Sequence, residues 1–267
     1  MILFVFFIGN LCISSYGLTD ILGNPSTQVG KKNLNVGIEY TTITRTFDLD
    51  TKDIDTNSER ITVKATTGLT DWLDVYIKAG GANLRLNYKE NNYAYQNLGT
   101  SVKDYNSDFS AGLGAGARLR LLNFVNSGTR VFLHGDCFAF QTNDDIVWNL
   151  LDGSVFTKNR DMKYGDIHVG LGISKRMDFV DFTVGVGYTT IWWEIEDIDI
   201  EERISPSSIS KIPLEKRDSW ETKNPVFGFI GFDFILPREY RVSIQAGLSN
   251  LENTEIGIAV SQGLERD

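Results

Sequence analysis

Apolar and polar residues alternate along much of this sequence, and this alternation constrains the fold more strongly than any other feature. In residues 107–122 every second residue is apolar: Phe109, Ala111, Leu113, Ala115, Ala117, Leu119 and Leu121. The residues between them are small or charged: Ser110, Gly112, Gly114, Gly116, Arg118 and Arg120. Because successive side chains of a β-strand point to opposite faces, this pattern predicts a strand with one apolar and one polar face.

About ten segments share this two-residue period, and no convincing amphipathic helix competes with them. They lie at 33–47, 58–68, 73–87, 107–122, 129–142, 162–176, 180–195, 221–235, 239–249 and 254–262. The period is interrupted at Gly80-Gly81, which predicts a β-bulge there. The sequence therefore predicts an all-β chain.

The first residues are strongly apolar and run to Ser15-Tyr16-Gly17, where small residues stand at the positions that a signal peptidase recognises. We expect residues 1–17 to be a cleaved secretory signal; an N-terminal membrane anchor is the alternative. Cleavage would leave Cys137 without a partner for an internal disulfide. The net charge of -9 argues against nucleic-acid binding, which needs a basic face.

The same alternation also fits a soluble β-sandwich or a lipocalin-like barrel. The connections between the segments favour a membrane barrel instead. Short connections at 69–72, 123–127, 177–179 and 237–238 alternate with long ones at 48–57, 88–106, 143–161 and 196–220. Transmembrane β-barrels place tight turns at the periplasmic end and long loops outside.

The polar face of the segments supports the same fold, because it carries charges of both signs in similar number. Its charged residues are Arg45, Arg60, Lys64, Lys78, Arg118, Arg120, Arg241, Glu39, Asp136, Asp166, Asp181, Asp233 and Glu255. Such a balance is expected of an enclosed lumen, where charges must pair. Aromatic residues also gather at both ends of the segments, as in membrane girdles: Trp72, Phe124, Phe179, Tyr188, Trp192 and Trp220.

Residues 68–76 are Gly-Leu-Thr-Asp-Trp-Leu-Asp-Val-Tyr, a turn that resembles the hairpins of outer-membrane β-barrel proteins. The glycine-rich segments 111–117 and 184–188 are similar to the same superfamily. With the pattern above, the resemblance implies that residues 18–267 form a single closed antiparallel up-and-down transmembrane β-barrel of about ten strands. Its short turns would be periplasmic, its long loops extracellular and its location the bacterial outer membrane. The last residues, 262–267, depart from the superfamily because they lack its usual terminal aromatic residue.

A barrel of about this size has little open lumen, so we expect a non-enzymatic structural or surface-interaction role through the extracellular loops. A narrow channel for small polar solutes is the alternative. Glycines on the inward face would either leave a narrow polar path or permit the strands to curve, and we favour strand curvature. These glycines are Gly112, Gly114, Gly116, Gly170, Gly172, Gly185 and Gly187. The expected partners are outer-membrane lipid and lipopolysaccharide, the outer-membrane assembly machinery, and a small solute or surface ligand.

The sequence predicts no catalytic, cofactor-binding or metal-binding residue. Asp166-Ile167-His168 has the Asp-x-His spacing of omptin-type surface proteases. His134 and Asp136 face inward on the neighbouring strand and are the possible partners of such a site. We prefer to interpret these residues as a hydrogen-bond network in the lumen. Cys137 is expected to face lipid. Two acidic groups are interpreted as solvated loops rather than Ca²⁺ sites: Asp48, Asp50, Asp53, Asp55 and Glu59, and Glu194, Glu196, Asp197, Asp199, Glu201 and Glu202.

Overall fold

The structure is a computed structural model in which part of the chain is described. The described residues are 33–49, 52–87, 99–103, 105–150, 155–205, 208–213, 217–218, 221–222, 225–237, 240–249 and 253–264. The expected signal peptide, residues 1–17, lies outside them, as does Trp220. Within the described residues, no helix is long and apolar enough to cross a membrane.

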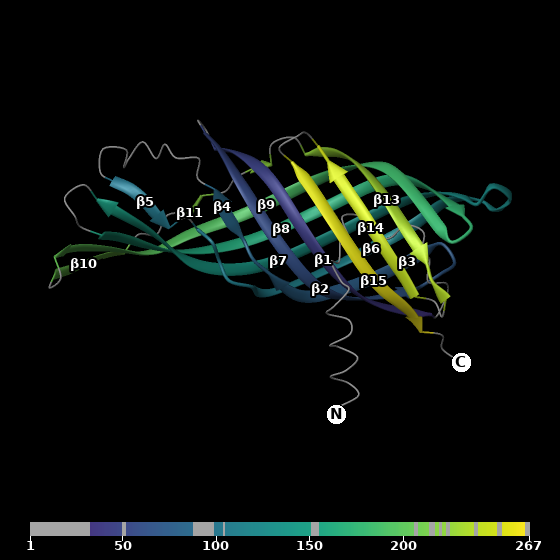
Figure 1. The fold of residues 1–267 in the computed structure, drawn as a ribbon, viewed down its shortest axis with the longest axis horizontal. Coiled ribbons are helices and arrows are strands. Elements are labelled where there is room, and N and C mark those ends of the chain that lie inside the picture. Colours follow the sequence, from purple (N-terminus) through teal and green to yellow (C-terminus); the bar gives the residue numbers. More distant parts are fainter. Residues whose placement is uncertain are drawn as a thin grey trace, which may run out of the picture.

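Ten strands form one closed antiparallel ring (Figure 1). In order around the ring they are β1 (Leu34–Leu49), β2 (Lys52–Gly68), β3 (Leu73–Ala82), β6 (Ser110–Phe124), β7 (Thr129–Leu150), β8 (Val155–Met177), β9 (Val180–Ser205), β13 (Val226–Ile235), β14 (Tyr240–Leu248) and β15 (Thr254–Leu264). β1 pairs with both β2 and β15, so the ring has no free edge. The predicted all-β, ten-stranded barrel is confirmed.

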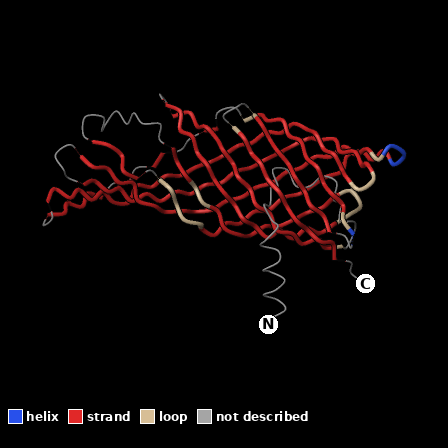
Figure 2. The backbone as a smooth tube through the Cα atoms, in the orientation of Figure 1, coloured by secondary structure: helices blue, strands red, loops and turns tan. Residues whose placement is uncertain are grey.

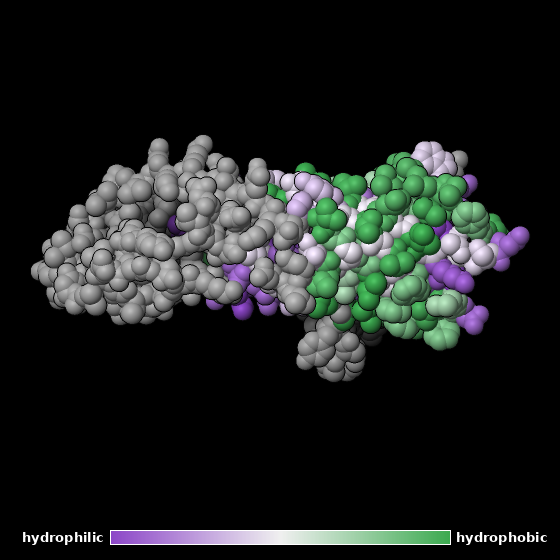
Figure 3. All heavy atoms as spheres, turned by 90° about the horizontal axis from the view of Figure 1, so that it is seen from above, coloured by the Kyte–Doolittle hydropathy of each residue, from purple (hydrophilic) through white to green (hydrophobic). Residues whose placement is uncertain are grey.

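The predicted division between an apolar and a polar face is also confirmed, with the apolar face outside. Figure 3 shows a broad hydrophobic area over the visible side of the ring. Leu113 of β6 and Ile77 of β3 are 70% and 68% exposed, whereas Asp181 of β9 is fully buried inside. Cys137 lies on the exposed outer face, as expected. A closed ring with an apolar outer wall satisfies every backbone hydrogen bond internally, which a bilayer requires.

The short connections are tight turns at one end of the ring, where the described chain also begins and ends. Aromatic side chains are exposed at this end, at Trp72, Phe124 and Phe179, and Tyr188 and Trp192 are exposed toward the opposite end. The predicted aromatic positions that can be placed are therefore confirmed. We follow the usual arrangement and call the turn end periplasmic.

The turn between β8 and β9 contains only Asp178 and Phe179, because Met177 pairs with Val180. Asp178 has a φ of 50°, in the left-handed region that few side chains tolerate. Two-residue hairpin turns require this backbone, and Asp accepts it better than a β-branched residue does.

Replacing Asp178 with valine is therefore expected to destabilise the barrel by about 1–2 kcal/mol, whereas Asp178→Gly is expected to be neutral or slightly stabilising. Urea unfolding of both variants in detergent micelles, followed by tryptophan fluorescence, measures the difference. Equal midpoints for the two variants would mean that the turn relaxes to another backbone conformation.

The long connections are largely β-structure rather than loops, which corrects the sequence-based expectation. The hairpin of β1 and β2 stays in register to Leu49 and Lys52, and that of β7 and β8 to Asn149 and Val155. β9 continues to Ser205 and pairs there with β10 (Ser208–Pro213) and β11 (Arg217–Asp218). β5 (Gly99–Lys103) pairs with the end of β7. These strands project beyond the ring as one sheet (Figure 2); we call it the protruding sheet.

The register sets charged residues opposite one another in the protruding sheet, of like sign at Asp161 and Glu196 and of opposite sign at other positions. Lys163 is opposite Glu194 and Arg160 is opposite Asp197. Lys211 of β10 is opposite Glu201.

The third predicted segment is split differently from the expectation. Its register with β2 and β6 continues through Gly80 and Gly81 without a shift, so the predicted bulge there is wrong. The strand is interrupted instead at Asn83 and Leu84, after which β4 (Arg85–Asn87) pairs again with β2. The Asn83 backbone N–H still donates to the Glu59 carbonyl oxygen at 3.0 Å, but the Glu59 backbone N–H donates at 2.8 Å to the Asn83 side-chain amide oxygen instead of to a backbone carbonyl.

Candidate functional site

The charged residues predicted for the lumen lie inside the ring, and most of them form ion pairs there. Each pair joins two different strands, so the pairs tie the wall together. Those with ordinary distances are Arg45–Glu255 at 2.6 Å, Lys64–Glu39 at 3.0 Å, Arg176–Asp181 at 3.1 Å and Arg118–Asp74 at 3.8 Å. The predicted pairing of enclosed charges is confirmed. A buried charge whose partner were missing would cost several kcal/mol.

One pair crosses the lumen instead of following the wall. Arg60 of β2 donates to Asp166 of β8, although three strands separate β2 from β8 on the shorter way round the ring. The Arg60 guanidinium also lies 4.8 Å from the ring centroid of Phe138 and 5.4 Å from that of Tyr164. Arginine combines a carboxylate contact with flat aromatic contacts because its guanidinium is planar. This arginine therefore crosses the lumen from β2 to β8, with aromatic rings beside its guanidinium.

Asp166 and His168 meet as the Asp-x-His spacing suggested. His168 Nε2 lies 3.3 Å from Asp166 Oδ1, and its Nδ1 lies 2.8 Å from the hydroxyl oxygen of Thr189. Both side chains are at most 2% exposed, and the Asp166 carboxylate also binds Arg60. Asp166, His168, Thr189 and Arg60 therefore form one buried group of polar side chains in the lumen.

His134 and Asp136, the other suggested members of a proteolytic site, bind elsewhere. The hydroxyl of Tyr76 contacts His134 Nε2 and donates to Asp136 Oδ1 at 3.0 Å. Lys78 donates to the other oxygen of Asp136. Tyr76 and Lys78 come from β3 and reach β7 across the intervening strand β6. These contacts make a second network beside that of Asp166, held by a tyrosine and a lysine that the motif did not include.

Glycines in β6, β8 and β9 provide the space for these interior side chains. A Cβ on Gly114 would lie 2.7 Å from Cε of Lys78, and one on Gly187 would lie 2.5 Å from Cζ of Phe227. A Cβ on Gly172 would lie 3.0 Å from Cζ of Phe229. Such distances are far shorter than van der Waals contact. These inward glycines therefore act as seats: they leave the space in which a side chain from another strand lies. This role differs from the two expected ones, strand curvature and a polar path through the lumen.

The sequence-based reasoning missed the aromatic part of the lumen. Phe132, Phe227 and Phe229 form a buried apolar cluster in the interior. The rings of Phe132 and Phe229 meet edge to face, with centroids 6.5 Å apart. The signal was present, because Phe132 shares its parity with the inward residue His134, two positions along the same strand. An interior filled by rings leaves less room than charged side chains alone.

The two acidic groups are only partly within the described side chains. Asp55 accepts a hydrogen bond from the Thr46 hydroxyl at 2.9 Å, and Glu59 lies 3.9 Å from Arg85. Both residues belong to β2 rather than to a loop. The other acidic side chains that the sequence singled out lie outside the described ones. Among those described, no group of three or more His, Cys, Asp or Glu side chains gathers as a metal site.

No protein-family model matches the sequence, and no curated protein sequence matches it. Solved structures with a similar course of the chain are outer-membrane barrels. The translocator domain of the autotransporter NalP from Neisseria meningitidis has 10% identity and a TM-score of 0.48, with 89% of this chain and 90% of that one covered. An outer membrane channel from Pseudomonas putida F1 has 10% identity and a TM-score of 0.42, with 92% and 98% covered.

The outer membrane protease OmpT from Escherichia coli is a third similar structure, at 9% identity and a TM-score of 0.41, with 94% of this chain and 97% of that one covered. The fold assignment rests on this chain's own geometry: the ring closes without an edge, its outer wall is apolar and its charges are enclosed. This chain is a closed ten-stranded antiparallel β-barrel whose apolar outer wall suits a lipid bilayer.

Proposed function

We propose that this barrel is a non-enzymatic surface protein that acts through its protruding sheet and does not serve as an open channel. The observation that carries the proposal is the contrast between a lumen filled by its own side chains and strands that run far beyond the membrane. Binding surfaces carried on a rigid scaffold are a common way for such folds to function.

The packing of the lumen is the first support. Arg60 and the cluster of Phe132, Phe227 and Phe229 are each at most 4% exposed. They come from β2, β7 and β13, on well-separated parts of the ring. Barrels of about eight strands have interiors that side chains fill, and ten strands remain near that limit. Rings seated on glycines occupy the section through which a solute would have to pass.

The lengths of the strands are the second support. A strand needs roughly 9–11 residues to span the membrane. β13, β14 and β15 have 10, 9 and 11 residues, as that requirement predicts. β7, β8 and β9 have 22, 23 and 26 residues, at least twice the requirement. The excess forms the protruding sheet, which gives the protein a surface outside the bilayer.

The environment of Asp166 and His168 argues against a protease. A general base must come within hydrogen-bond reach of the water or group that it activates. Asp166 is committed to Arg60, and the His168 ring packs against Phe227 with centroids 6.3 Å apart. We expect the purified protein to cleave no peptide, and His168→Ala to leave any background rate unchanged. A fluorogenic peptide library measures both; a rate that falls with this substitution would contradict the proposal.

Planar-bilayer recordings test the closed lumen, and a trimmed variant tests the protruding sheet. In the variant, residues 146–158 are replaced by Asn-Gly, which closes the β7–β8 hairpin directly between the paired residues Asp145 and Asn159. We expect no single-channel steps from either protein. We also expect binding to immobilised lipopolysaccharide to fall at least tenfold in the trimmed variant, with heat-modifiability on gels as the control for folding. Discrete steps from the full protein, or undiminished binding by the trimmed one, would overturn the proposal.

A further inference from the structure

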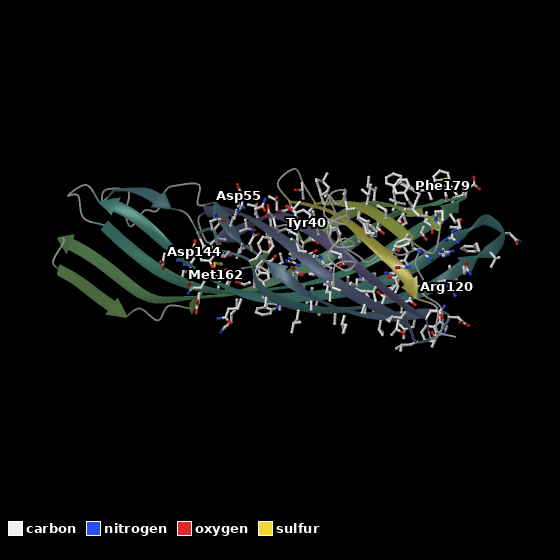
Figure 4. The ribbon with its side chains drawn as sticks, turned by 60° about the horizontal axis from the view of Figure 1, so that its bottom comes forward. Tyr40, Asp55, Arg120, Asp144, Met162 and Phe179 are labelled. Atoms are coloured by element: carbon white, nitrogen blue, oxygen red, sulfur yellow. The ribbon has the colours of Figure 1, made fainter. Side chains whose placement is uncertain are left out.

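Within the described residues, four arginines gather near the periplasmic mouth of the lumen. They are Arg120 of β6, Arg130 of β7, Arg176 of β8 and Arg241 of β14. Two inward carboxylates lie at the same level, Asp181 of β9 and Asp233, which is directly opposite it on β13. Figure 4 places Arg120 at the turn end, together with Phe179. Among the described side chains at this level, arginines therefore outnumber carboxylates, although the whole chain is negative.

Arg130, Arg176 and Asp181 form the best-defined part of this mouth. Arg176 binds Asp181 in a bidentate manner, with Nε and Nη2 each 3.1 Å from one carboxylate oxygen. Arg130 Nη1 is 4.0 Å from the same carboxylate. Arg120 and Arg176 are both close enough to Arg130 to repel its charge. Two guanidiniums therefore approach one carboxylate, which already makes two good hydrogen bonds to Arg176. Arg120 lies beside them and donates to the backbone carbonyl oxygen of Asp71 in the neighbouring turn.

The turn between β6 and β7 fixes this convergence. Its last residue, Gly128, has a φ of 64°, and its carbonyl oxygen accepts a hydrogen bond from the backbone N–H of Arg176 at 3.0 Å. This bond joins the beginning of β7 to the end of β8, so Arg130 and Arg176 lie side by side. Their side chains are 18% and 40% exposed, which leaves both accessible from the periplasm.

Two buried hydroxyls stand directly above these arginines. Ser174 of β8 pairs in register with Arg130 on one side and with Thr183 on the other, and all three face the lumen. Ser174 and Thr183 are each 1% exposed. Within the described part of the chain, neither hydroxyl has a hydrogen-bond partner. A buried hydroxyl without a partner costs about 1–3 kcal/mol, so a ligand that accepts hydrogen bonds there would be favoured.

We propose that Arg120, Arg130, Arg176, Ser174 and Thr183, here called the mouth cluster, bind an oxyanion that enters from the periplasmic side. The ligand class is a carboxylate or phosphate group. The guanidiniums supply charge-assisted hydrogen bonds in the fork geometry that such groups fit, and the two hydroxyls donate from above. A cation is disfavoured, because Asp181 is occupied by Arg176. The site is independent of the protruding sheet and lies at the opposite end of the barrel.

The test uses the full protein, folded in detergent, and isothermal titration with pyrophosphate and with glutarate. We expect both anions to bind at low salt and to bind more weakly as sodium chloride rises. Arg130→Gln is expected to weaken binding at least tenfold. Lys175→Gln is the matched control, because Lys175 neighbours Arg176 but is exposed and carries the same charge; its affinity is expected to equal that of the unmodified protein.

Ser174→Ala separates a built site from a merely positive surface, because it changes no charge. We expect it to weaken pyrophosphate binding by at least threefold. The proposal is overturned if neither anion binds, if Lys175→Gln weakens binding as much as Arg130→Gln does, or if Ser174→Ala binds like the unmodified protein. Repeating the pyrophosphate titration in lipid nanodiscs distinguishes the two natural sources of the oxyanion. Weaker pyrophosphate binding in phosphatidylglycerol than in phosphatidylcholine nanodiscs means that lipid headgroups occupy the site. Equal binding in the two lipids means that the site takes soluble anions.

Discussion

Arg60→Met is expected to destabilise the barrel by about 3–5 kcal/mol, because it leaves the Asp166 carboxylate buried without its arginine. The carboxylate is 1% exposed and lies where water cannot replace the lost partner. Methionine keeps much of the apolar stem that packs near Phe138, so the loss reports mainly on the charge. Urea unfolding in detergent micelles, monitored by tryptophan fluorescence, measures the change in the free energy of unfolding.

The double variant Arg60→Met with Asp166→Leu is the control for this interpretation. Replacing a buried ion pair by apolar residues of similar size is often neutral, so the double variant is expected to recover most of the lost stability. If Arg60→Met alone unfolds at the same urea concentration as the unmodified protein, water reaches Asp166 and the lumen is less filled than proposed.

Gly185→Ala is expected to cost about 1–3 kcal/mol, the usual price of overpacking a well-filled interior. A Cβ at this position would meet the ring of Phe229 and would lie 2.5 Å from the carbonyl oxygen of Leu171. The ring can turn, but the carbonyl belongs to the backbone of the neighbouring strand and cannot move without disturbing the ladder. The same unfolding measurement applies.

Gly135→Ala and Gly228→Ala are the matched controls, since both glycines also lie within strands of the ring. At each of them the nearest atom to an added Cβ is 4.0 Å away, so no clash is expected. Their stability is expected to stay the same or rise by roughly 0.4–1 kcal/mol, because alanine restricts the unfolded chain. Equal losses at Gly135 and Gly185 would show that strand propensity, rather than the seating of Phe229, decides the cost.

The strand number and the direction of each side chain were predictable, because the period of two is a local property. The residues of β6 illustrate this: alternation alone put Leu113 outside and Arg118 inside, and both positions are confirmed. The pairing of enclosed charges was also predictable as a general requirement. Which partners pair was not, since Arg60 and Asp166 are 106 residues apart and meet only when the ring closes.

The protruding sheet was missed for a different reason. Its residues are rich in charge, and charged stretches without clear alternation are typical of loops. Lys163 becomes favourable in a strand only when the register sets Glu194 opposite it, and a single segment does not reveal its register. The seats at Gly172 and Gly187 were likewise invisible, because the rings that need the space come from other strands.

The continuity of β8 has a mechanical consequence. One uninterrupted strand carries Val155 near the tip of the protruding sheet and Asp166 in the centre of the lumen. A pull on that tip therefore passes along β8 into the wall of the barrel, through hydrogen bonds arranged in shear. The ladder with β7 is continuous, whereas the ladder with β9 shifts register once, between Asn159 and Arg160. A protruding sheet of this kind resists bending far better than a loop of equal length attached at the rim of the barrel.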